Sequence, residues 1–207
     1  MKKRNLVLVR HGQSEWNAKN LFTGWKDPDL TGLGLNEAEN AGILINKTGI
    51  NFDKMFTSNL IRAQKTGSII LSTMQQADVQ IIKNQSLNER NYGSLAGLNK
   101  DDARKKWGEE QVHIWRRSFD IPPPDGESLK DTAERVLPYF NDEIMPNVIK
   151  GDNILIAAHG NSLRALIMQL DGISDQDIVK LEIPTGAPIH YAFNKDGSIG
   201  LKEKLYE

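Results

Sequence analysis

Near its N-terminus the chain reads Leu6-Val7-Leu8-Val9-Arg10-His11-Gly12. Its four apolar residues do not alternate with polar ones, which is typical of a strand that helices cover on both faces of a parallel sheet. A second stretch repeats the pattern, because Ile154-Leu155-Ile156-Ala157-Ala158 is followed by His159-Gly160-Asn161. We therefore expect two central parallel strands, with His11 directly after the end of the first and His159 directly after the end of the second.

The segments around these two strands predict further strands. Residues 54–57 and 79–82 have weaker strand patterns, and residues 189–193 and 199–206 predict two edge strands joined by a turn at 194–198. Helical patterns alternate with the strands, which favours an α/β fold. The expected helices span residues 31–47, 60–74, 100–117, 128–148 and 163–170, with Thr31, Ser58 and Ser128 as candidate caps.

Two prolines interrupt the helical pattern that begins at Ser128. Apolar residues recur on one face at spacings of three and four as far as Val148. Because proline lacks an N–H and its ring disturbs the preceding turn, we expect a kink at Pro138 and an early end at Pro146. The whole pattern predicts a single domain over residues 1–207. It is a three-layer α/β/α sandwich with a mostly parallel central sheet, helices on both faces and a helical insertion at about 93–127.

Composition excludes several classes of protein. The 207 residues include 26 Lys and Arg against 27 Asp and Glu, a net charge of −1, and 39% are hydrophobic. This balance disfavours both a nucleic-acid-binding protein and a disordered chain. The absence of cysteine excludes disulfides, thiolate metal sites and cysteine nucleophiles, and suits a reducing compartment. No signal-peptide core or membrane-spanning run is present, so the sequence predicts a soluble cytoplasmic protein.

The two strand-end histidines are the strongest chemical signal. Ligands of open parallel sheets bind beyond the carboxyl ends of the strands, so His11 and His159 would face one crevice if their strands are neighbours. Each could instead be an ordinary hydrogen-bonded residue at a strand end, but a duplicated His-Gly favours function. Zinc lacks an evident third ligand, and a serine hydrolase lacks a Gly-x-Ser-x-Gly elbow. Arg10 beside His11 favours phosphoryl chemistry, because a guanidinium matches phosphate geometry.

Longer motifs carry a family resemblance. The stretch Leu8-Val9-Arg10-His11-Gly12-Gln13-Ser14-Glu15-Trp16-Asn17 is similar to the signature of the histidine phosphatase superfamily, and nearly the whole chain resembles its cofactor-dependent (2,3-bisphosphoglycerate-dependent) phosphoglycerate mutases. The blocks around Glu89-Arg90-Asn91-Tyr92 and Trp115-Arg116-Arg117 are specific to the mutases. The resemblance continues through residues 22–25, 57–63, 97–100, 126–129, 158–164 and 183–186.

The resemblance implies a role for five catalytic residues. His11 would be the nucleophile that becomes a phosphohistidine, since an uncharged imidazole can attack phosphorus at neutral pH. Arg10, Arg62 and a protonated His159 would stabilise the charge on the transferring oxygens. Glu89 would be the general acid and base, with a pKa close to the working pH.

The resemblance also implies a substrate site. Lys100, Arg116 and Arg117 would act as a lid that binds the substrate carboxylate and its distal phosphate, although a solvated basic helix face is the ordinary interpretation of such residues. His113 and His190 match no family position. The implied substrate-binding residues are Arg10, Ser14, Asn17, Thr23, Gly24, Arg62, Glu89, Arg90, Asn91, Tyr92, Lys100, Arg116, Arg117, Gly160 and Asn161.

The activity implied is that of an isomerase. The enzyme would interconvert 3-phosphoglycerate and 2-phosphoglycerate through a phosphohistidine, primed by 2,3-bisphosphoglycerate, in glycolysis and gluconeogenesis. No metal would be needed, because arginines would stabilise the charge. The expected partner is a small phosphorylated carboxylic acid, and neither nucleic acid nor a membrane. The five cationic residues of this site against Glu89 carry a net charge of +4, which leaves −5 for the rest of the chain.

Two departures from the family keep alternatives open. The loop after Arg117 is short, with only residues 118–125 before Gly126, and the chain ends at Glu207, close after the last expected strand. A shorter tail would admit water to a phosphohistidine and favour hydrolysis, so a histidine phosphatase acting on a small metabolite is the first alternative. A non-catalytic phospho-ligand-binding module is the second, although His11, Glu89 and His159 are all present. The short loop leaves both a monomer and a homo-oligomer open.

Overall fold

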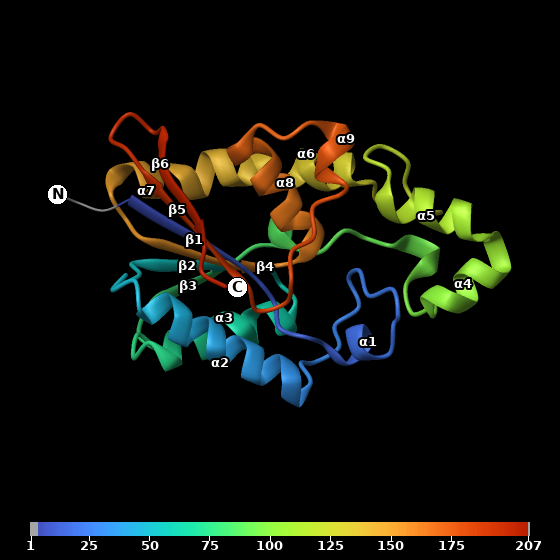
Figure 1. Cartoon of the computed structure of the whole chain (residues 1–207), viewed down its shortest axis with the longest axis horizontal. Coiled ribbons are helices and arrows are strands. Elements are labelled where there is room, and N and C mark those ends of the chain that lie inside the picture. Colours follow the sequence, from blue (N-terminus) through green and yellow to red (C-terminus); the bar gives the residue numbers. More distant parts are fainter. Residues whose placement is uncertain (1–3, 207) are drawn as a thin grey trace.

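The computed structural model describes residues 4–206, so residues 1–3 and 207 of the predicted domain lie outside the described part. A six-stranded sheet runs through it in the order β3-β2-β4-β1-β5-β6 (Figure 1). The four strands from β3 to β1 are parallel, whereas β5 and β6 extend the sheet as an antiparallel hairpin. The strands are β1 (Arg4–Arg10), β2 (Lys54–Thr57), β3 (Gln80–Lys83), β4 (Ile154–Ala158), β5 (Pro188–Phe193) and β6 (Ile199–Lys204).

The two central strands are direct neighbours, as expected. β1 and β4 pair in parallel with Val9 opposite Ala157 and Arg10 opposite Ala158. The register continues one residue further, because the His11 backbone N–H donates to the Ala158 carbonyl at 2.9 Å. His11 and His159 therefore leave the sheet at the same edge and at the same level. The expectation that residues 189–193 form an edge strand is wrong, since β5 lies between β1 and β6.

Helices cover both faces of the sheet, which confirms the three-layer prediction (Figure 1). Alternation along β1 sends Leu6 and Leu8 into a core with α6 and α8, and Val7 and Val9 into a core with α2 and α3. All four side chains are completely buried. The α-helices are α1 (Glu15–Ala18), α2 (Gly32–Asn46), α3 (Ile61–Thr73), α4 (Lys100–Trp107), α5 (Glu109–Arg117), α6 (Leu129–Tyr139), α7 (Met145–Lys150), α8 (Gly160–Asp171) and α9 (Asp175–Ile178).

The predicted start of α3 needs a correction. Thr31 caps α2 as expected, but the N-cap of α3 is Leu60, and no side chain caps this helix. The Ser58 hydroxyl accepts a hydrogen bond from the Leu60 N–H at 3.1 Å and bonds the His159 imidazole at 2.7 Å. Ser58 is therefore committed to the strand-end histidine instead of the first helical turn.

The helix that starts after Ser128 does not end at its second proline. Helical structure continues to Lys150, because a π-helical segment, Phe140–Ile144, joins α6 to α7. Pro138 lies within α6, and Pro146 occupies the first turn of α7. Proline is tolerated at that position, because its missing N–H removes at most one backbone hydrogen bond. The predicted early end at Pro146 is therefore wrong. A widened turn before a proline separates its ring from the preceding carbonyls.

Residues 93–127, the predicted insertion, lie beyond the carboxyl ends of the parallel strands (Figure 1). The expected helix over 100–117 is divided at Gly108, whose φ of +86° favours glycine, into α4 and α5. Short 3₁₀ turns at Gln85–Leu87 and Gly93–Leu95 precede α4. α4 and α5 pack around a small core of their own, formed by Phe22, Leu95, Ala103 and Val112. Throughout residues 4–206, no helix combines the length and apolar character needed to cross a membrane.

Candidate active site

The two strand-end histidines form the centre of the site. Their ring centroids lie 5.0 Å apart, and His11 and His159 are 2% and 0% exposed. Gly12 permits this arrangement, because a Cβ at that position would lie 2.2 Å from the Gly34 carbonyl oxygen. The start of α2 thus packs directly against the backbone that carries His11.

Hydrogen bonds orient the His11 imidazole. Its Nδ1 lies 2.7 Å from the Gly12 carbonyl oxygen, which can only accept, so Nδ1 carries the proton and donates. Nε2 then holds the free electron pair, and the Arg62 Nε–H points at it from 3.3 Å. Burial, Arg62 and Arg10 hold the pKa of His11 well below its usual value, against a smaller opposing effect of the Gly12 carbonyl. His11 is therefore a neutral imidazole with Nε2 available for attack.

Two arginines place positive charge beside His11. Arg62 is 1% exposed, and its Nη1 and Nη2 donate to the carbonyls of Lys26 and Gly24 at 2.8 and 2.9 Å. Burial lowers the pKa of Arg62 to about 10, against opposing effects of Glu89 and Asp27, so it remains charged at neutral pH. Arg10 donates from Nη1 to the Ile183 carbonyl at 2.7 Å. Both guanidinium groups are thus fixed by backbone carbonyls.

His159 differs from the prediction in its protonation. Burial lowers the pKa of His159 well below its ordinary value, and the charge of Arg62 and the neighbouring His11 lower it further. The imidazole is therefore neutral, whereas the sequence predicted a protonated one. Its Nε2 lies 2.7 Å from the Ser58 hydroxyl, and its buried Nδ1 has no hydrogen-bond partner within the described chain.

Glu89 is buried and held as a carboxylate. Its Oε1 accepts from the Arg90 N–H at 2.8 Å and from the backbone and side-chain N–H groups of Asn161 at 3.1 and 3.0 Å. Burial raises the pKa of Glu89, but the Arg90 N–H, the Asn161 amide and the charges of Arg10 and Arg62 together lower it below its ordinary value. These surroundings therefore favour the charged carboxylate over the protonated acid. A Cβ added to Gly160 would lie 3.7 Å from Oε2, so Oε2 faces the start of α8.

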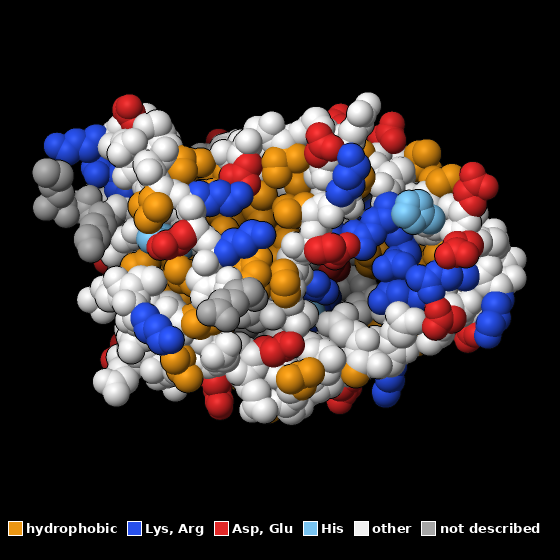
Figure 2. Space-filling view, viewed as in Figure 1, with side chains coloured by type: hydrophobic (Ala, Val, Ile, Leu, Met, Phe, Trp, Pro, Cys, Tyr) orange, Lys and Arg blue, Asp and Glu red, His pale blue; other side chains and the backbone are white. Residues whose placement is uncertain are grey.

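These groups line one pocket, which Figure 2 shows as a hollow edged by Lys and Arg side chains. Its wall contains six Lys and Arg residues against two carboxylates. This net positive charge favours an anion. The wall consists of Arg10, His11, Asn17, Leu21, Phe22, Thr23, Gly24, Arg62, Glu89, Tyr92, Lys100, Arg116, Arg117, Gly160, Asn161, Arg164 and Glu182.

Four of the predicted site residues do not line this wall. The His159 ring is completely buried next to the His11 ring. Ser14 caps α1 in a reciprocal pair of hydrogen bonds with Asn17. The Arg90 guanidinium stacks on the Tyr92 ring at 4.7 Å and donates to the Arg116 carbonyl. Asn91 pairs with Glu127 through its backbone.

Sequence reasoning missed two charged residues of the pocket. Arg164 donates to the Asn161 side-chain oxygen at 3.1 Å, and Glu182 forms ion pairs with Arg117 and Arg164. Arg164 lies within a motif block that carries the family resemblance, which was the one signal for it. Glu182 lies in the segment before β5, and its position becomes evident only from the packing of that segment against α5 and α8.

Buried donors without partners point to the kind of ligand. Within the described chain, Arg10 Nε, Thr23 Oγ1, Arg90 Nε and His159 Nδ1 are buried and make no hydrogen bond, and of these residues Arg10 and Thr23 line the pocket. Unpaired buried donors are costly, so a group rich in acceptor oxygens fits them. A phosphoryl group supplies such oxygens beside Nε2 of His11. The residues present therefore fit an anionic phosphoester.

Comparison with known proteins agrees with this geometry. The model of the histidine phosphatase superfamily (branch 1) matches residues 6–201. The chain belongs to this superfamily. A protein of Parvibaculum lavamentivorans named 2,3-bisphosphoglycerate-dependent phosphoglycerate mutase is 63% identical over 98% of this chain and 96% of its own length. One of the same name from Mesorhizobium japonicum is 61% identical over 98% of both chains.

Similarity to these relatives over almost the whole length places this chain in the 2,3-bisphosphoglycerate-dependent phosphoglycerate mutase family. Solved structures share the fold at lower identity. A phosphoglycerate mutase from Bacillus anthracis has a TM-score of 0.79 at 22% identity, covering 97% of this chain and 91% of that one. A mycobacterial glucosyl-3-phosphoglycerate phosphatase has a TM-score of 0.81 at 21% identity, covering 98% and 97%.

Proposed function

We propose that this chain interconverts 3-phosphoglycerate and 2-phosphoglycerate by carrying a phosphoryl group on His11. The observation that supports this most strongly is the fixed tautomer of His11, whose Nε2 faces Arg62 in a positively charged pocket. The names of the 58–63% identical relatives support the choice of substrate. We infer a cytoplasmic enzyme of glycolysis and gluconeogenesis.

His11 and Glu89 would divide the chemistry between them. A bond forms between Nε2 and phosphorus while the bond from phosphorus to the substrate oxygen breaks, and Arg10 and Arg62 stabilise the charge on the other oxygens. Glu89 gives a proton to the departing alkoxide, and in the reverse transfer it takes the proton of the attacking hydroxyl. A phosphoryl dianion offsets the charges of Arg10 and Arg62, which would raise the pKa of Glu89 toward the value that an acid needs.

The insertion at 93–127 would serve as a lid over this chemistry. Lys100, Arg116 and Arg117 reach the pocket from α4 and α5. We infer that they bind the carboxylate and the distal phosphate of the substrate. Burial lowers the pKa values of Lys100 and Arg116, which is consistent with side chains that face a ligand site.

The unpaired donors Arg10 Nε, Thr23 Oγ1 and His159 Nδ1 would hold 2,3-bisphosphoglycerate as well as substrate. That compound supplies the phosphoryl group that loads His11 before the first turnover. His159 would donate its Nδ1 proton to a phosphoryl oxygen if the Ser58 hydroxyl donates to its Nε2. A neutral His159 can therefore stabilise the transferring group.

One assay tests this proposal. Purified protein is supplied with 3-phosphoglycerate, with and without a trace of 2,3-bisphosphoglycerate, and both 2-phosphoglycerate and free phosphate are measured. We expect isomerisation that depends on the trace compound. Phosphate release without isomerisation would indicate a phosphatase, and binding without turnover would indicate a non-catalytic module.

A further inference from the structure

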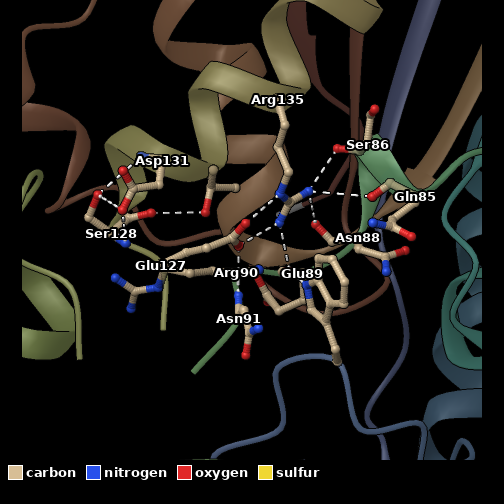
Figure 3. A network of polar contacts seen from close by, with 12 residues as sticks. Gln85, Ser86, Asn88, Glu89, Arg90, Asn91, Glu127, Ser128, Asp131 and Arg135 are labelled. Atoms are coloured by element: carbon tan, nitrogen blue, oxygen red, sulfur yellow. Dashed lines mark hydrogen bonds and ion pairs between the residues drawn. The ribbon is translucent and has the colours of Figure 1, made fainter. Parts of the chain in front are cut away.

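A polar network outside the pocket joins the segment that carries Glu89 to helix α6 (Figure 3). Its centre is the ion pair between Arg135, on α6, and Glu127, just before that helix. The two side chains are only 19% and 21% exposed. Neither residue lines the pocket, so the pair cannot act on a substrate directly.

The Arg135 guanidinium makes contacts on two sides. Nε and Nη2 each lie 2.8 Å from a different oxygen of Glu127, in the bidentate geometry that only arginine offers. Its remaining hydrogens face the backbone of the neighbouring loop. Nη1 donates to the carbonyls of Ser86 and Asn88 at 2.9 and 3.1 Å, and Nη2 donates to the carbonyl of Glu89 at 2.9 Å.

Glu127 holds the same loop from its other end. Its Oε2 accepts from the Asn91 N–H at 2.8 Å, and its own N–H donates to the Asn91 carbonyl at 2.8 Å. The capping box between Ser128 and Asp131 fixes the start of α6 next to Glu127. The pair thus holds the backbone on both sides of Glu89 against a rigid helix.

A third contact fixes the Glu89 peptide itself. The Trp25 indole N–H donates to the Glu89 carbonyl at 2.7 Å, and the Arg135 guanidinium lies 5.6 Å from the Trp25 ring. The Glu89 carbonyl therefore has two donors. With the backbone fixed, Oε1 of the carboxylate meets its three N–H donors. Oε2 faces Gly160, which lines the pocket.

We propose that the Arg135–Glu127 pair is a positioning unit for Glu89 and sets the efficiency of proton transfer in the reaction. This rests on the proposed function, in which Glu89 is the acid and base. A lysine at position 135 keeps one positive charge but cannot bind both Glu127 oxygens and three carbonyls together. We expect Arg135→Lys to misplace the Glu89 carboxylate while leaving His11 and Arg62 in position.

The test compares two leaving groups. Departure of an alkoxide from a phosphoglycerate needs a proton from Glu89, whereas departure of nitrophenolate from 4-nitrophenyl phosphate does not. We expect Arg135→Lys to lower kcat for isomerisation by about 10- to 100-fold with little change in KM, as a misplacement of about 1 Å can. The burst of nitrophenolate that accompanies phosphorylation of His11 should change little, because nitrophenolate leaves without a proton from Glu89 and the His11 and Arg62 side chains keep their positions.

Two variants complete the experiment. Glu89→Gln should show the same selective loss, because it removes the acid itself. Arg4→Lys is a matched control, since Arg4 bonds the Ile149 carbonyl at the opposite end of β1, and both rates should be unaffected. Equal losses of isomerisation and burst in Arg135→Lys would mean a merely structural role, and no loss in either would also overturn the proposal.

The same measurements distinguish a failure of the mutase assignment from a failure of the positioning role. If the wild-type protein gave a burst but no isomerisation, the mutase assignment would fail. The positioning role would still be decided by the ratio of alkyl to aryl phosphate turnover in Arg135→Lys and the wild type. An unchanged ratio would contradict it.

Discussion

At the scale of single residues, the chemistry depends on which nitrogen of His11 carries the proton. The Gly12 carbonyl accepts from Nδ1, so the nucleophilic electron pair lies on Nε2, toward Arg62. Burial keeps the ring neutral by lowering its pKa. In the proposed reaction, this arrangement would let His11 attack phosphorus without a separate base.

Loss of a lid cation should affect substrates according to whether they carry a carboxylate. We expect Arg116→Ala to raise KM for 3-phosphoglycerate by about 10- to 100-fold, which corresponds to one charged hydrogen bond. KM for 4-nitrophenyl phosphate, which has no carboxylate, should change little. Steady-state kinetics with both substrates measures this.

Lys105→Ala is the matched control for the lid. Lys105 lies on α4, is 79% exposed and pairs with Asp102 away from the pocket. Its removal should leave both KM values unchanged. Equal increases of KM for the two substrates in Arg116→Ala would contradict a carboxylate-binding role.

The sequence alone predicts these residues unevenly. Arg10, His11 and His159 follow from two similar strand ends, because the carboxyl edge of a parallel sheet is where ligands bind. Glu89 is one acid among 27 Asp and Glu, and only the family motif distinguishes it. Glu182 has no sequence signal, since its place in the pocket depends on how the segment before β5 packs.

At the scale of elements, close packing between β1 and α2 positions His11. A Cβ on Gly34 would lie 2.1 Å from the Gln13 carbonyl oxygen, whereas a Cβ on Gly32 would meet nothing within 4 Å. Gly34→Ala should therefore destabilise the fold by about 1–3 kcal/mol through overpacking. Gly32→Ala, in the same helix, should be neutral or stabilising by up to about 1 kcal/mol.

Urea unfolding of the two glycine variants measures this difference. Both changes add one methyl group to the first turn of α2, so helix propensity alone affects them alike. A Gly34→Ala variant as stable as Gly32→Ala would show that the helix can move away from the strand. Reduced activity of Gly34→Ala at full stability would indicate a displaced His11 instead.

Element boundaries were less predictable than the elements themselves. Ser58 is an acceptable helix cap by residue type, yet its hydroxyl is used by His159, 101 positions along the chain. Pro146 normally ends a helix, but a π-helical segment before it lets the helix continue. In both cases a tertiary or local adjustment outweighs a propensity, and neither can be read from neighbouring residues.

At the scale of the whole molecule, buried neutral histidines make stability depend on pH. The pKa values of His11 and His159 lie below 6.5 in the folded chain, mainly through burial. As pH falls below 6.5, the unfolded chain gains protons that the folded chain does not. The free energy of unfolding should then decrease, by at most about 1.4 kcal/mol per pH unit for each histidine.

The pH dependence can be assigned with two variants. Urea unfolding between pH 7.5 and 5.5 should show a smaller loss of stability for His159→Gln than for the wild type. His113→Gln should match the wild type, because His113 is exposed on α5. Equal slopes for all three proteins would contradict the buried neutral state of His159.

Charge is distributed unevenly over the molecule. The net charge of the chain is −1, yet the pocket wall holds six cationic residues against two carboxylates. The rest of the chain therefore carries a net charge of −5, and the positive charge at the pocket would attract a small anion.

Transfer of a labelled phosphoryl group shows directly whether His11 carries the phosphoryl group between substrates. The protein is loaded from ³²P-labelled 2,3-bisphosphoglycerate and then mixed with unlabelled 3-phosphoglycerate. We predict an acid-labile label on Nε2 of His11, absent from His11→Ala, that passes to the phosphoglycerates when 3-phosphoglycerate is added. Label that forms on His11→Ala, or that leaves only as inorganic phosphate at a rate independent of 3-phosphoglycerate, would contradict phosphoryl transfer through His11.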